Sequence, residues 1–228
     1  MNKCVVITGA SRGIGLELAR KYAGLGGYDV VACCRTNPGH LVDSAEIKVV
    51  ENVDVTQPGS LDILKNYLGE TKVDLLINNA GILHVDDACN VADKVQDIRD
   101  QFEVNSIGPL MTTLALRPNF GEGSRVAIIG SRMGSISDNT SGSYYGYRMS
   151  KAAVNQACMS LSRDLAPEGV IVQVFHPGFV DTDMTARSAS DAKISPDTSA
   201  KGLVKEIEAM SIETTGMFKS FNGEIIEW

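Results

Sequence analysis

Residues 4–15 read CVVITGASRGIG, and this stretch decides the fold. The run Cys4–Thr8 is too short for a buried helix and is rich in Val and Ile, which is typical of a strand buried on both faces of a parallel sheet. Glycines follow at positions 9, 13 and 15, and apolar residues then recur on one helical stripe, at Ile14, Leu18, Tyr22 and Leu25. The sequence therefore predicts a strand, a glycine-rich turn and a helix in direct succession.

The glycine-rich turn is placed to bind a phosphate group. Ligands of open α/β sheets bind at the carboxyl ends of the strands, where the first amides of a helix and its dipole favour anions. Glycine lets the backbone approach a pyrophosphate and lets the helix pack against the strand. The spacing is GxxxGxG rather than GxGxxG, and glycines alone also form ordinary tight turns. Their place between a buried strand and an amphipathic helix favours nucleotide binding.

The same pattern continues to the end of the chain. Short apolar runs alternate with longer helical stretches, and the further runs are Val30–Cys34, Lys48–Val53, Val73–Ile77, Val126–Ile129 and Ile171–Phe175. This alternation predicts an α/β fold, a single Rossmann-type doubly wound parallel sheet with helices on both faces. No linker, repeat or low-complexity tract divides residues 1–228, so we expect one domain.

A polar segment stands out late in the chain. Residues 182–195 are rich in Ser, Ala, Asp and Thr, and a helix is predicted from Pro196 to Met210. Long polar loops late in α/β domains often cover a ligand, which favours a substrate-binding insert near 182–210. An ordinary surface loop has the same composition.

Composition excludes several classes of function. The 228 residues include 21 basic and 28 acidic side chains, a net charge of −7 without basic clusters, which disfavours binding to nucleic acid or to an anionic membrane. No apolar run approaches the roughly 18 residues that span a bilayer, and the start is too briefly apolar before Arg12 for a signal peptide. Five cysteines and three scattered histidines show no disulfide framework, CxxC pair or metal-ligand spacing. We expect a cytoplasmic protein without a metal.

The charges near the glycine-rich turn predict which nucleotide binds. A carboxylate after the second strand would hold a ribose 2′-hydroxyl, whereas an arginine there suits a 2′-phosphate. The second run ends in Cys33-Cys34-Arg35-Thr36 without an acid, and Arg12 lies inside the turn itself. These residues favour NADP(H) over NAD(H), although both arginines could simply be solvated surface side chains.

Tyr147 and Lys151 stand four residues apart in a predicted helix that continues to Leu165. Residues at this spacing share a helix face, about 6 Å apart along the axis. A phenol has a pKa of about 10, and a nearby lysine cation favours its ionised form. The pair could therefore exchange a proton with a carbonyl or alcohol oxygen. Taken alone, the YxxxK pattern is also common on exposed helices.

Two further polar residues accompany this pair. Ser131 follows the run Val126–Ile129, so its hydroxyl could polarise the same oxygen, whereas the sequence contains no GxSxG elbow for a serine hydrolase. Asn105 is predicted inside a helix, where asparagine is unfavourable. Pro109 lacks the amide that would bond the Asn105 carbonyl, which leaves this carbonyl free for a water molecule.

These motifs, in this order, resemble the short-chain dehydrogenase/reductase family over essentially the whole chain. The matching pieces are TGASRGIG at 8–15, Asp54-Val55, NNAG at 78–81, Asn105 within FEVN, Ser131, the Tyr147/Lys151 pair and HPGFVDT at 176–182. The stretch GSYYGYRMSKAAVN and the ending NGEIIEW are most similar to the sniffer-like and C-factor-like carbonyl reductases.

The resemblance implies a role for each matching residue. Tyr147 would be the acid–base group, Lys151 would hold the nicotinamide ribose and lower the tyrosine pKa, Ser131 would orient the carbonyl, and Asn105 would anchor a water molecule linked to Lys151. Coenzyme contacts would come from the turn (Gly9, Ser11, Arg12, Gly13, Ile14 and Gly15), from Arg35, from Asp54 and Val55 at adenine, from Asn79, Ala80 and Gly81 at the ribose, and from Pro177, Gly178, Val180 and Thr182 at the nicotinamide.

Some of these assignments have competing interpretations. Sixteen residues separate Ser131 from Tyr147, more than the family's usual spacing, so Ser135 is an alternative to Ser131. In isolation Asn78 and Asn79 could be turn formers, and Asp54 a cap.

The hypothesis with most support is an NADPH-dependent reductase of a small aldehyde, ketone or quinone, with Tyr147 supplying the proton. A nucleotide-binding signalling protein with little or no turnover is the alternative, and an epimerase or dehydratase on the same fold is a third. The helices holding Asn105 and Tyr147 resemble those that pair subunits in this family, so a homodimer is expected.

Overall fold

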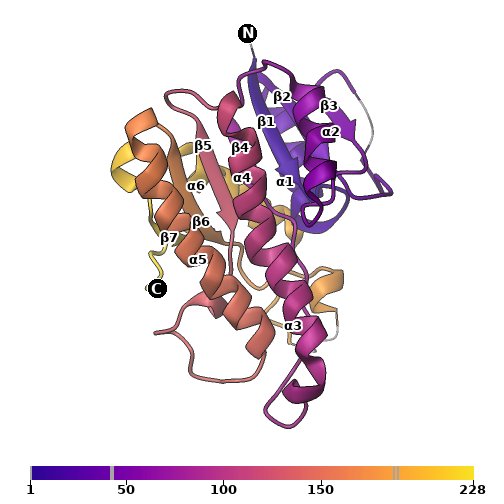
Figure 1. Cartoon of the computed structure of the whole chain (residues 1–228), viewed down its shortest axis with the longest axis vertical. Coiled ribbons are helices and arrows are strands. Elements are labelled where there is room, and N and C mark those ends of the chain that lie inside the picture. The colour runs from indigo at the N-terminus through magenta and orange to yellow at the C-terminus, as the bar shows by residue number, and fades with distance from the viewer. Residues whose placement is uncertain (1, 42–43, 187, 189) are drawn as a thin grey trace.

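The computed structural model describes residues 2–41, 44–186, 188 and 190–228. Its centre is one sheet of seven parallel strands in the order β3-β2-β1-β4-β5-β6-β7 (Figure 1). The strands are β1 (Lys3–Thr8), β2 (Tyr28–Cys33), β3 (Ile47–Val50), β4 (Leu75–Asn78), β5 (Arg125–Ile129), β6 (Ile171–His176) and β7 (Phe218–Ser220). The predicted doubly wound sheet is confirmed.

Helices cover both faces of the sheet. They are α1 (Gly13–Leu25), α2 (Pro58–Leu68), α3 (Val95–Phe102), α4 (Gly108–Leu116), α5 (Tyr145–Leu165) and α6 (Pro196–Glu208). The buried side chains of α1 and α6 belong to one core cluster, and those of α2, α4 and α5 belong to the other. Figure 1 shows α2, α4 and α5 in front of the sheet, with α1 and α6 behind it.

Strand β1 shows why the apolar runs are continuous rather than alternating. Successive side chains of a strand point to opposite faces. Val5 and Ile7 lie in the cluster under α1 and α6, whereas Cys4 and Val6 lie in the cluster under α2 and α5. Both faces are therefore buried, and the central positions from Cys4 to Ile7 are all apolar.

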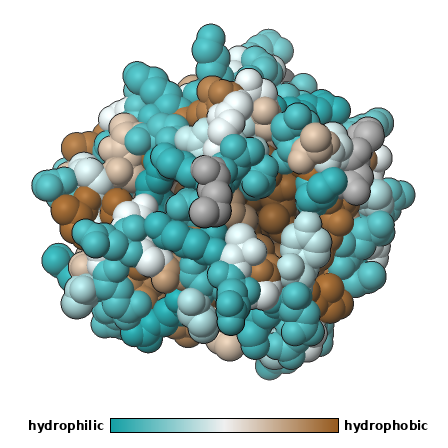
Figure 2. Space-filling model, turned by 90° about the horizontal axis from the view of Figure 1, so that it is seen from above, coloured by the Kyte–Doolittle hydropathy of each residue, from teal (hydrophilic) through white to brown (hydrophobic). Residues whose placement is uncertain are grey.

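The strand order reverses between β1 and β4, and this reversal opens a crevice at their carboxyl ends. The glycine-rich turn follows β1, and the NNAG motif begins at the last residue of β4. Ser131 follows β5, and Pro177 follows β6. The predicted site residues thus meet at one edge of the sheet. The opposite end of the molecule, shown in Figure 2, is covered mostly by polar side chains with apolar ones between them.

The structure contains one strand that the sequence did not indicate, and one helix that ends earlier than predicted. Strand β7 was not predicted, because its three residues at the edge of the sheet form no apolar run of useful length. The helix predicted from Pro196 ends at Glu208, and it buries Ala200, Leu203 and Ile207 against the sheet beside α1. Of the expected insert near 182–210, the helical half is therefore part of the core layer, and residues 187 and 189 lie outside the described residues.

Within the described ranges, no helix is long and apolar enough to cross a membrane. The same residues contain no group of three or more His, Cys, Asp or Glu side chains that could hold a metal ion.

Candidate active site

The glycine-rich turn depends on its glycines for conformation and for close packing. Gly9 and Gly13 have φ angles of 64° and 55°, which side chains other than glycine rarely adopt. A Cβ at position 9 would lie 2.8 Å from the Ala80 Cα, and a Cβ at position 15 would collide with the Gly9 carbonyl oxygen and the Asn79 side chain. The backbone at the start of α1 is therefore left bare, with its first amides available to an anion.

Asn79 holds this turn against the end of β4. Its Nδ2 donates to the carbonyl oxygens of Thr8 and Gly9, both at 3.0 Å. In return, the Thr8 hydroxyl accepts from the backbone amides of Asn79 and Ala80, at 3.0 and 3.2 Å. The side chain of Asn79 thus fixes the shape of the crevice, and the ribose contact of residues 79–81 stays a prediction.

Arg12 lies within the glycine-rich turn, and Arg35 lies in the loop that follows β2. Arg12 donates through Nη1 to Asp183 Oδ2 at 3.0 Å, and both side chains are highly exposed. Arg35 is exposed, and in the part of the chain that the structure describes it forms no ion pair. Its loop packs onto the turn, because a Cβ at Gly39 would lie 2.5 Å from the Ser11 carbonyl oxygen. Ser11, Arg12 and Arg35 therefore surround one polar corner of the crevice.

Asp54 and Val55 lie near this corner but are partly engaged elsewhere. Asp54 Oδ1 accepts from the backbone amide and the hydroxyl of Thr56, at 2.9 and 2.8 Å, so one oxygen caps its own turn. Val55 is buried, and a Cβ at Gly108 would lie 2.8 Å from its Cγ2. The adenine contact of this pair stays a prediction, and the capping interaction is observed.

Helix α5 carries Tyr147 and Lys151 on one buried face, as predicted from their spacing. Lys151 Nζ donates to the Ile129 carbonyl oxygen at 2.9 Å and lies 5.8 Å from the centre of the Tyr147 ring. The short turn η4 (Arg132–Gly134) lies directly on the helix, since a Cβ at Gly134 would approach the Lys151 backbone to 2.8 Å. The end of β5 is thereby fixed against the Tyr147 face of α5.

Burial sets the protonation of this pair. It raises the pKa of Tyr147 to about 12, an effect that a hydrogen bond with Ser131 partly opposes. It also lowers the pKa of Lys151 to about 8, because the ammonium loses its hydration. Lys151 is not among the groups that shift the Tyr147 pKa here, so its predicted lowering of that pKa stays a prediction. At neutral pH the structure therefore holds a protonated phenol beside a lysine cation.

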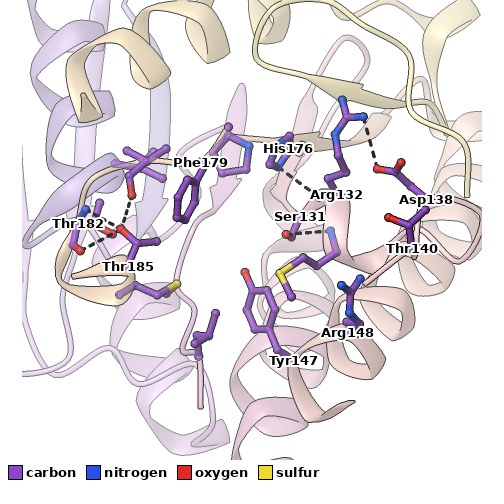
Figure 3. Close-up of a pocket in the computed structure, with 18 residues that line it drawn as sticks. Ser131, Arg132, Asp138, Thr140, Tyr147, Arg148, His176, Phe179, Thr182 and Thr185 are labelled. Carbon is purple, nitrogen blue, oxygen red and sulfur yellow. Dashed lines mark hydrogen bonds and ion pairs between the residues drawn. The ribbon is translucent and has the colours of Figure 1, made fainter. Parts of the chain in front are cut away.

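Ser131, rather than Ser135, faces the cavity. Its Oγ accepts from the Met133 amide at 3.2 Å, and Figure 3 shows its hydroxyl and that of Tyr147 directed toward each other. Ser135 is 2% exposed and hydrogen-bonds within its own loop, to Ser137 and to the Asp138 amide. The long spacing to Tyr147 is thus accommodated by the loop at 135–144.

Asn105 lies in a π-helical turn, η2 (Glu103–Ile107), between α3 and α4. Its side chain forms two hydrogen bonds with the Ile82 backbone, both of 2.9 Å, and a third of 3.0 Å with the Ser150 hydroxyl. Both donor positions of the amide are therefore used in tying the segment after β4 to α5, and the water molecule predicted at the Asn105 backbone carbonyl stays a prediction. A π turn in place of an ordinary helix is consistent with the missing amide of Pro109.

A cavity of about 460 Å³ extends between the start of α1, the end of β5 and the first turn of α5. Of the residues expected from the sequence, Ile14, Ser131, Tyr147, Pro177, Gly178, Val180 and Thr182 line it. Its remaining walls come from residues to which the sequence pattern assigns no individual role: Leu83, Gly130, Arg132, Met133, Asp138, Thr140, Arg148, His176, Phe179, Met184 and Thr185. The neighbourhood of Ser131 and the HPGFVDT motif could have indicated Arg132, Met133, His176 and Phe179. Asp138 and Thr140 belong to the stretch SISDNTSGS at 135–143, which the sequence predicts to cover the substrate together with 182–195, whereas Leu83 lies on an irregular segment without such a signal.

His176 has a defined protonation in this wall. Its Nδ1 accepts from the Arg132 amide at 3.2 Å, so in the neutral ring the proton lies on Nε2 (Figure 3). Burial and the Arg132 charge lower the pKa of His176 to about 4. The imidazole is therefore neutral at physiological pH and does not act as a cation toward a bound ligand.

Comparisons with known proteins agree with this geometry. The chain is 38% identical over 227 residues to 1-hydroxy-2-glutathionyl-2-methyl-3-butene dehydrogenase of Rhodococcus sp. (strain AD45), covering 98% of this chain and 99% of that protein. It is 41% identical over 158 residues to C-signal of Myxococcus xanthus, covering 68% of this chain and 93% of that protein.

Solved structures show the same similarity. Carbonyl reductase Sniffer of D. melanogaster superposes with a TM-score of 0.89 at 29% identity, with both chains covered completely. The NADPH-bound carbonyl reductase from chicken fatty liver superposes with a TM-score of 0.87 at 26% identity, covering 100% of this chain and 99% of that one. The resemblance to sniffer-like and C-factor-like proteins is confirmed. Because a family model described as short chain dehydrogenase also matches residues 3–193, the chain belongs to the short-chain dehydrogenase family.

Proposed function

We propose that this chain is an NADPH-dependent carbonyl reductase that acts on a small aldehyde, ketone or quinone. The observation that carries the proposal is the shared cavity: the hydroxyls of Ser131 and Tyr147 face each other in it, and it extends to Ile14 in the glycine-rich turn. The buried Lys151 ammonium lies behind Tyr147. A bound carbonyl oxygen would meet two hydroxyl donors at the place where a nicotinamide ring would fit.

The residues present suit NADP(H). The bare backbone around Gly9, Gly13 and Gly15 leaves room for a pyrophosphate at the start of α1. Ser11, Arg12 and Arg35 offer a hydroxyl and two cations for a 2′-phosphate, and no carboxylate follows β2. NADPH is also the coenzyme of the similar chicken carbonyl reductase. When bound, NADPH supplies the hydride for the carbonyl carbon.

The side chains supply the proton. Since burial holds the pKa of Tyr147 at about 12, its hydroxyl is protonated at neutral pH and can donate to the carbonyl oxygen. Ser131 orients that oxygen by a hydrogen bond. The Lys151 cation stabilises the phenolate that remains, because opposite charges interact strongly in a buried site. Proton transfer from Tyr147 Oη thus completes reduction of the carbonyl to an alcohol.

The test is a panel of aldehydes, ketones and quinones assayed with NADPH and NADH in parallel. Tyr147→Phe removes the proton donor and is expected to lower kcat/KM by at least about 100-fold. Tyr145→Phe is the matched control, because Tyr145 is a half-exposed tyrosine of the same helix. NADPH oxidation that persists unchanged in Tyr147→Phe would exclude the mechanism.

The second candidate is a nucleotide-binding signalling protein with little or no turnover. The similarity to C-signal is the observation that favours it. The same panel separates the two, since binding of coenzyme without reduction of any carbonyl would support signalling.

A further inference from the structure

The extended segment 82–86, which leaves the end of β4, is fastened to the helices at every second residue. Asn105 binds both backbone groups of Ile82. Four residues earlier on the same helical stretch, Gln101 Oε1 accepts from the His84 amide at 3.0 Å. Asp86 makes the third attachment, to the start of α5. Between these points Leu83 lines the cavity.

Asp86 is a buried carboxylate whose partners are helix amides. Asp86 is 1% exposed. Its Oδ1 accepts from the Tyr145 amide at 2.5 Å, and its Oδ2 accepts from the Gly146 amide at 3.1 Å. Its carbonyl oxygen accepts from the Tyr144 amide at 2.8 Å. Across the described ranges Asp86 forms no ion pair with a Lys or Arg. A buried charge is costly without compensation, and here the compensation comes from the positive end of the α5 dipole.

Helix α5 needs this contact because it lacks a cap of its own. The residue before it, Tyr144, has a left-handed backbone with φ of 55°, and its side chain makes no capping hydrogen bond. Glycine at 146 makes the approach possible, since a Cβ there would lie 3.2 Å from Asp86 Oδ2 and 2.9 Å from Ile98 Cγ1. A residue 59 positions earlier in the chain therefore does the work of the N-cap.

Tyr147 is the third residue of α5, directly after the two residues whose amides Asp86 binds. We propose that Asp86 is a positioning residue: by clamping the first turn of α5 to the segment that carries Leu83, it fixes the Tyr147 hydroxyl relative to Ser131 and the cavity wall. It does not line the cavity itself. The proposal rests on the proposed function, because it assigns Tyr147 a position that matters for proton transfer.

The test compares Asp86→Asn with Asp87→Asn. Asp87 is a matched control in the same loop, since its carboxylate caps only its own turn, at the amides of Cys89 and Asn90. For each protein we would measure kcat and KM on the carbonyl compound that the unmutated protein reduces fastest, NADPH affinity by fluorescence titration, and the melting temperature. Asp86→Asn is expected to lower kcat about tenfold, with KM and NADPH affinity within about twofold of the unmutated protein, because misplacing a catalytic group by a fraction of an ångström lowers the rate steeply. Asp87→Asn is expected to leave kcat unchanged.

Two results would overturn the proposal. One is an unchanged kcat in folded Asp86→Asn. The other is a loss of kcat with a loss of NADPH affinity of the same fold-change and a lower melting temperature, which would indicate general damage to the structure. Asp86→Ser, which keeps one acceptor for the helix amides, replaces the Asn variant if the latter does not fold. If the unmutated protein reduces no carbonyl, the proposed function has failed, and crystal structures then test the positioning directly. The Tyr147 hydroxyl is expected to move away from Ser131 in Asp86→Asn, and an unmoved hydroxyl would refute the role of Asp86.

Discussion

The two arginines of the glycine-rich corner differ in what already holds them. Arg12 lies 3.0 Å from Asp183, but both side chains are 76% exposed, so water screens the pair. Such a surface pair changes an equilibrium by at most about fivefold, and Arg12 can exchange this partner for a phosphate at little cost. Arg35 is exposed and, among the residues described, has no acidic partner to give up. Coenzyme choice therefore rests first on Arg35.

Replacing Arg35 with Asp is expected to shift coenzyme preference toward NADH. The new carboxylate would repel a 2′-phosphate and could accept a hydrogen bond from a ribose 2′-hydroxyl. We expect the ratio of kcat/KM with NADPH to that with NADH to fall at least about tenfold. Arg163→Asp, on an exposed position near the end of α5, controls for the change in net charge. Equal use of both coenzymes by the unmutated protein would show that the arginines do not select the coenzyme.

The buried Lys151 predicts how reduction depends on pH. Its ammonium is present below its pKa of about 8 and is lost above it, whereas Tyr147 keeps its proton up to about 12. Reduction should therefore slow as the pH rises through 8, because the phenolate left by proton transfer loses its neighbouring cation. The measurement is kcat between pH 6 and 10. In Lys151→Arg, whose side chain stays charged over this range, any remaining activity should show no such decrease.

Which residues the sequence could place depended on whether their signal is local. Tyr147 and Lys151 were predictable because their spacing alone puts them on one helix face. The raised tyrosine pKa was not, because burial depth depends on how η4 and α5 pack. The side chains of Asn79 and Asp86 make their hydrogen bonds with residues 59 or more positions away, so nothing in their sequence neighbourhood reveals these roles.

At the scale of elements, five of the six predicted apolar runs match strands to within two residues at each end, because strands buried on both faces have few polar positions to blur the pattern. The run 48–53 is shorter as a strand, since β3 ends at Val50 and the chain then turns toward Asp54. The π turn at Glu103–Ile107 could not be predicted from periodicity, because one widened turn barely shifts an apolar stripe. Only the Asn105 and Pro109 pair indicated a local irregularity.

The junction of β1, the glycine-rich turn and α1 is expected to tolerate glycine alone at position 15. Gly15→Ala would press a methyl group against the Gly9 carbonyl and the Asn79 amide that ties the turn to β4. We expect at least a tenfold loss of NADPH affinity and a lower melting temperature.

Gly24→Ala in the same helix is the control, since nothing lies within 4 Å of a Cβ there. It should stabilise the protein by about 0.5–1 kcal/mol, because alanine favours helix over glycine. Similar NADPH affinity in the two variants would contradict the packing role of Gly15.

The site as a whole belongs to the sheet rather than to any one segment. Its cavity is bounded by residues from Ile14 to Thr185, brought together because parallel strands end at the same edge. Figure 1 shows the loops below the strands converging there, beside the starts of α3 and α5. A motif therefore locates its own side chain, whereas the neighbours of that side chain follow only from the strand order.

Exposed apolar side chains on α4 and α5 predict that two subunits pair through these helices. Ile107, Met111 and Leu114 are spaced by four and three residues along one stripe of η2 and α4, and they are 41%, 39% and 42% exposed. On the adjacent helix α5, Met149 is 50% exposed. Apolar side chains at such spacing on an exposed helix face favour pairing with another surface, and the helices involved are those expected to pair two subunits.

We therefore expect a homodimer in solution, measured by light scattering coupled to gel filtration. Leu114→Glu should yield a folded monomer, because it would bury a charge in the contact, whereas Leu25→Glu at the exposed end of α1 should remain dimeric. A monomeric unmutated protein at micromolar concentrations would rule out this use of the α4 and α5 surface.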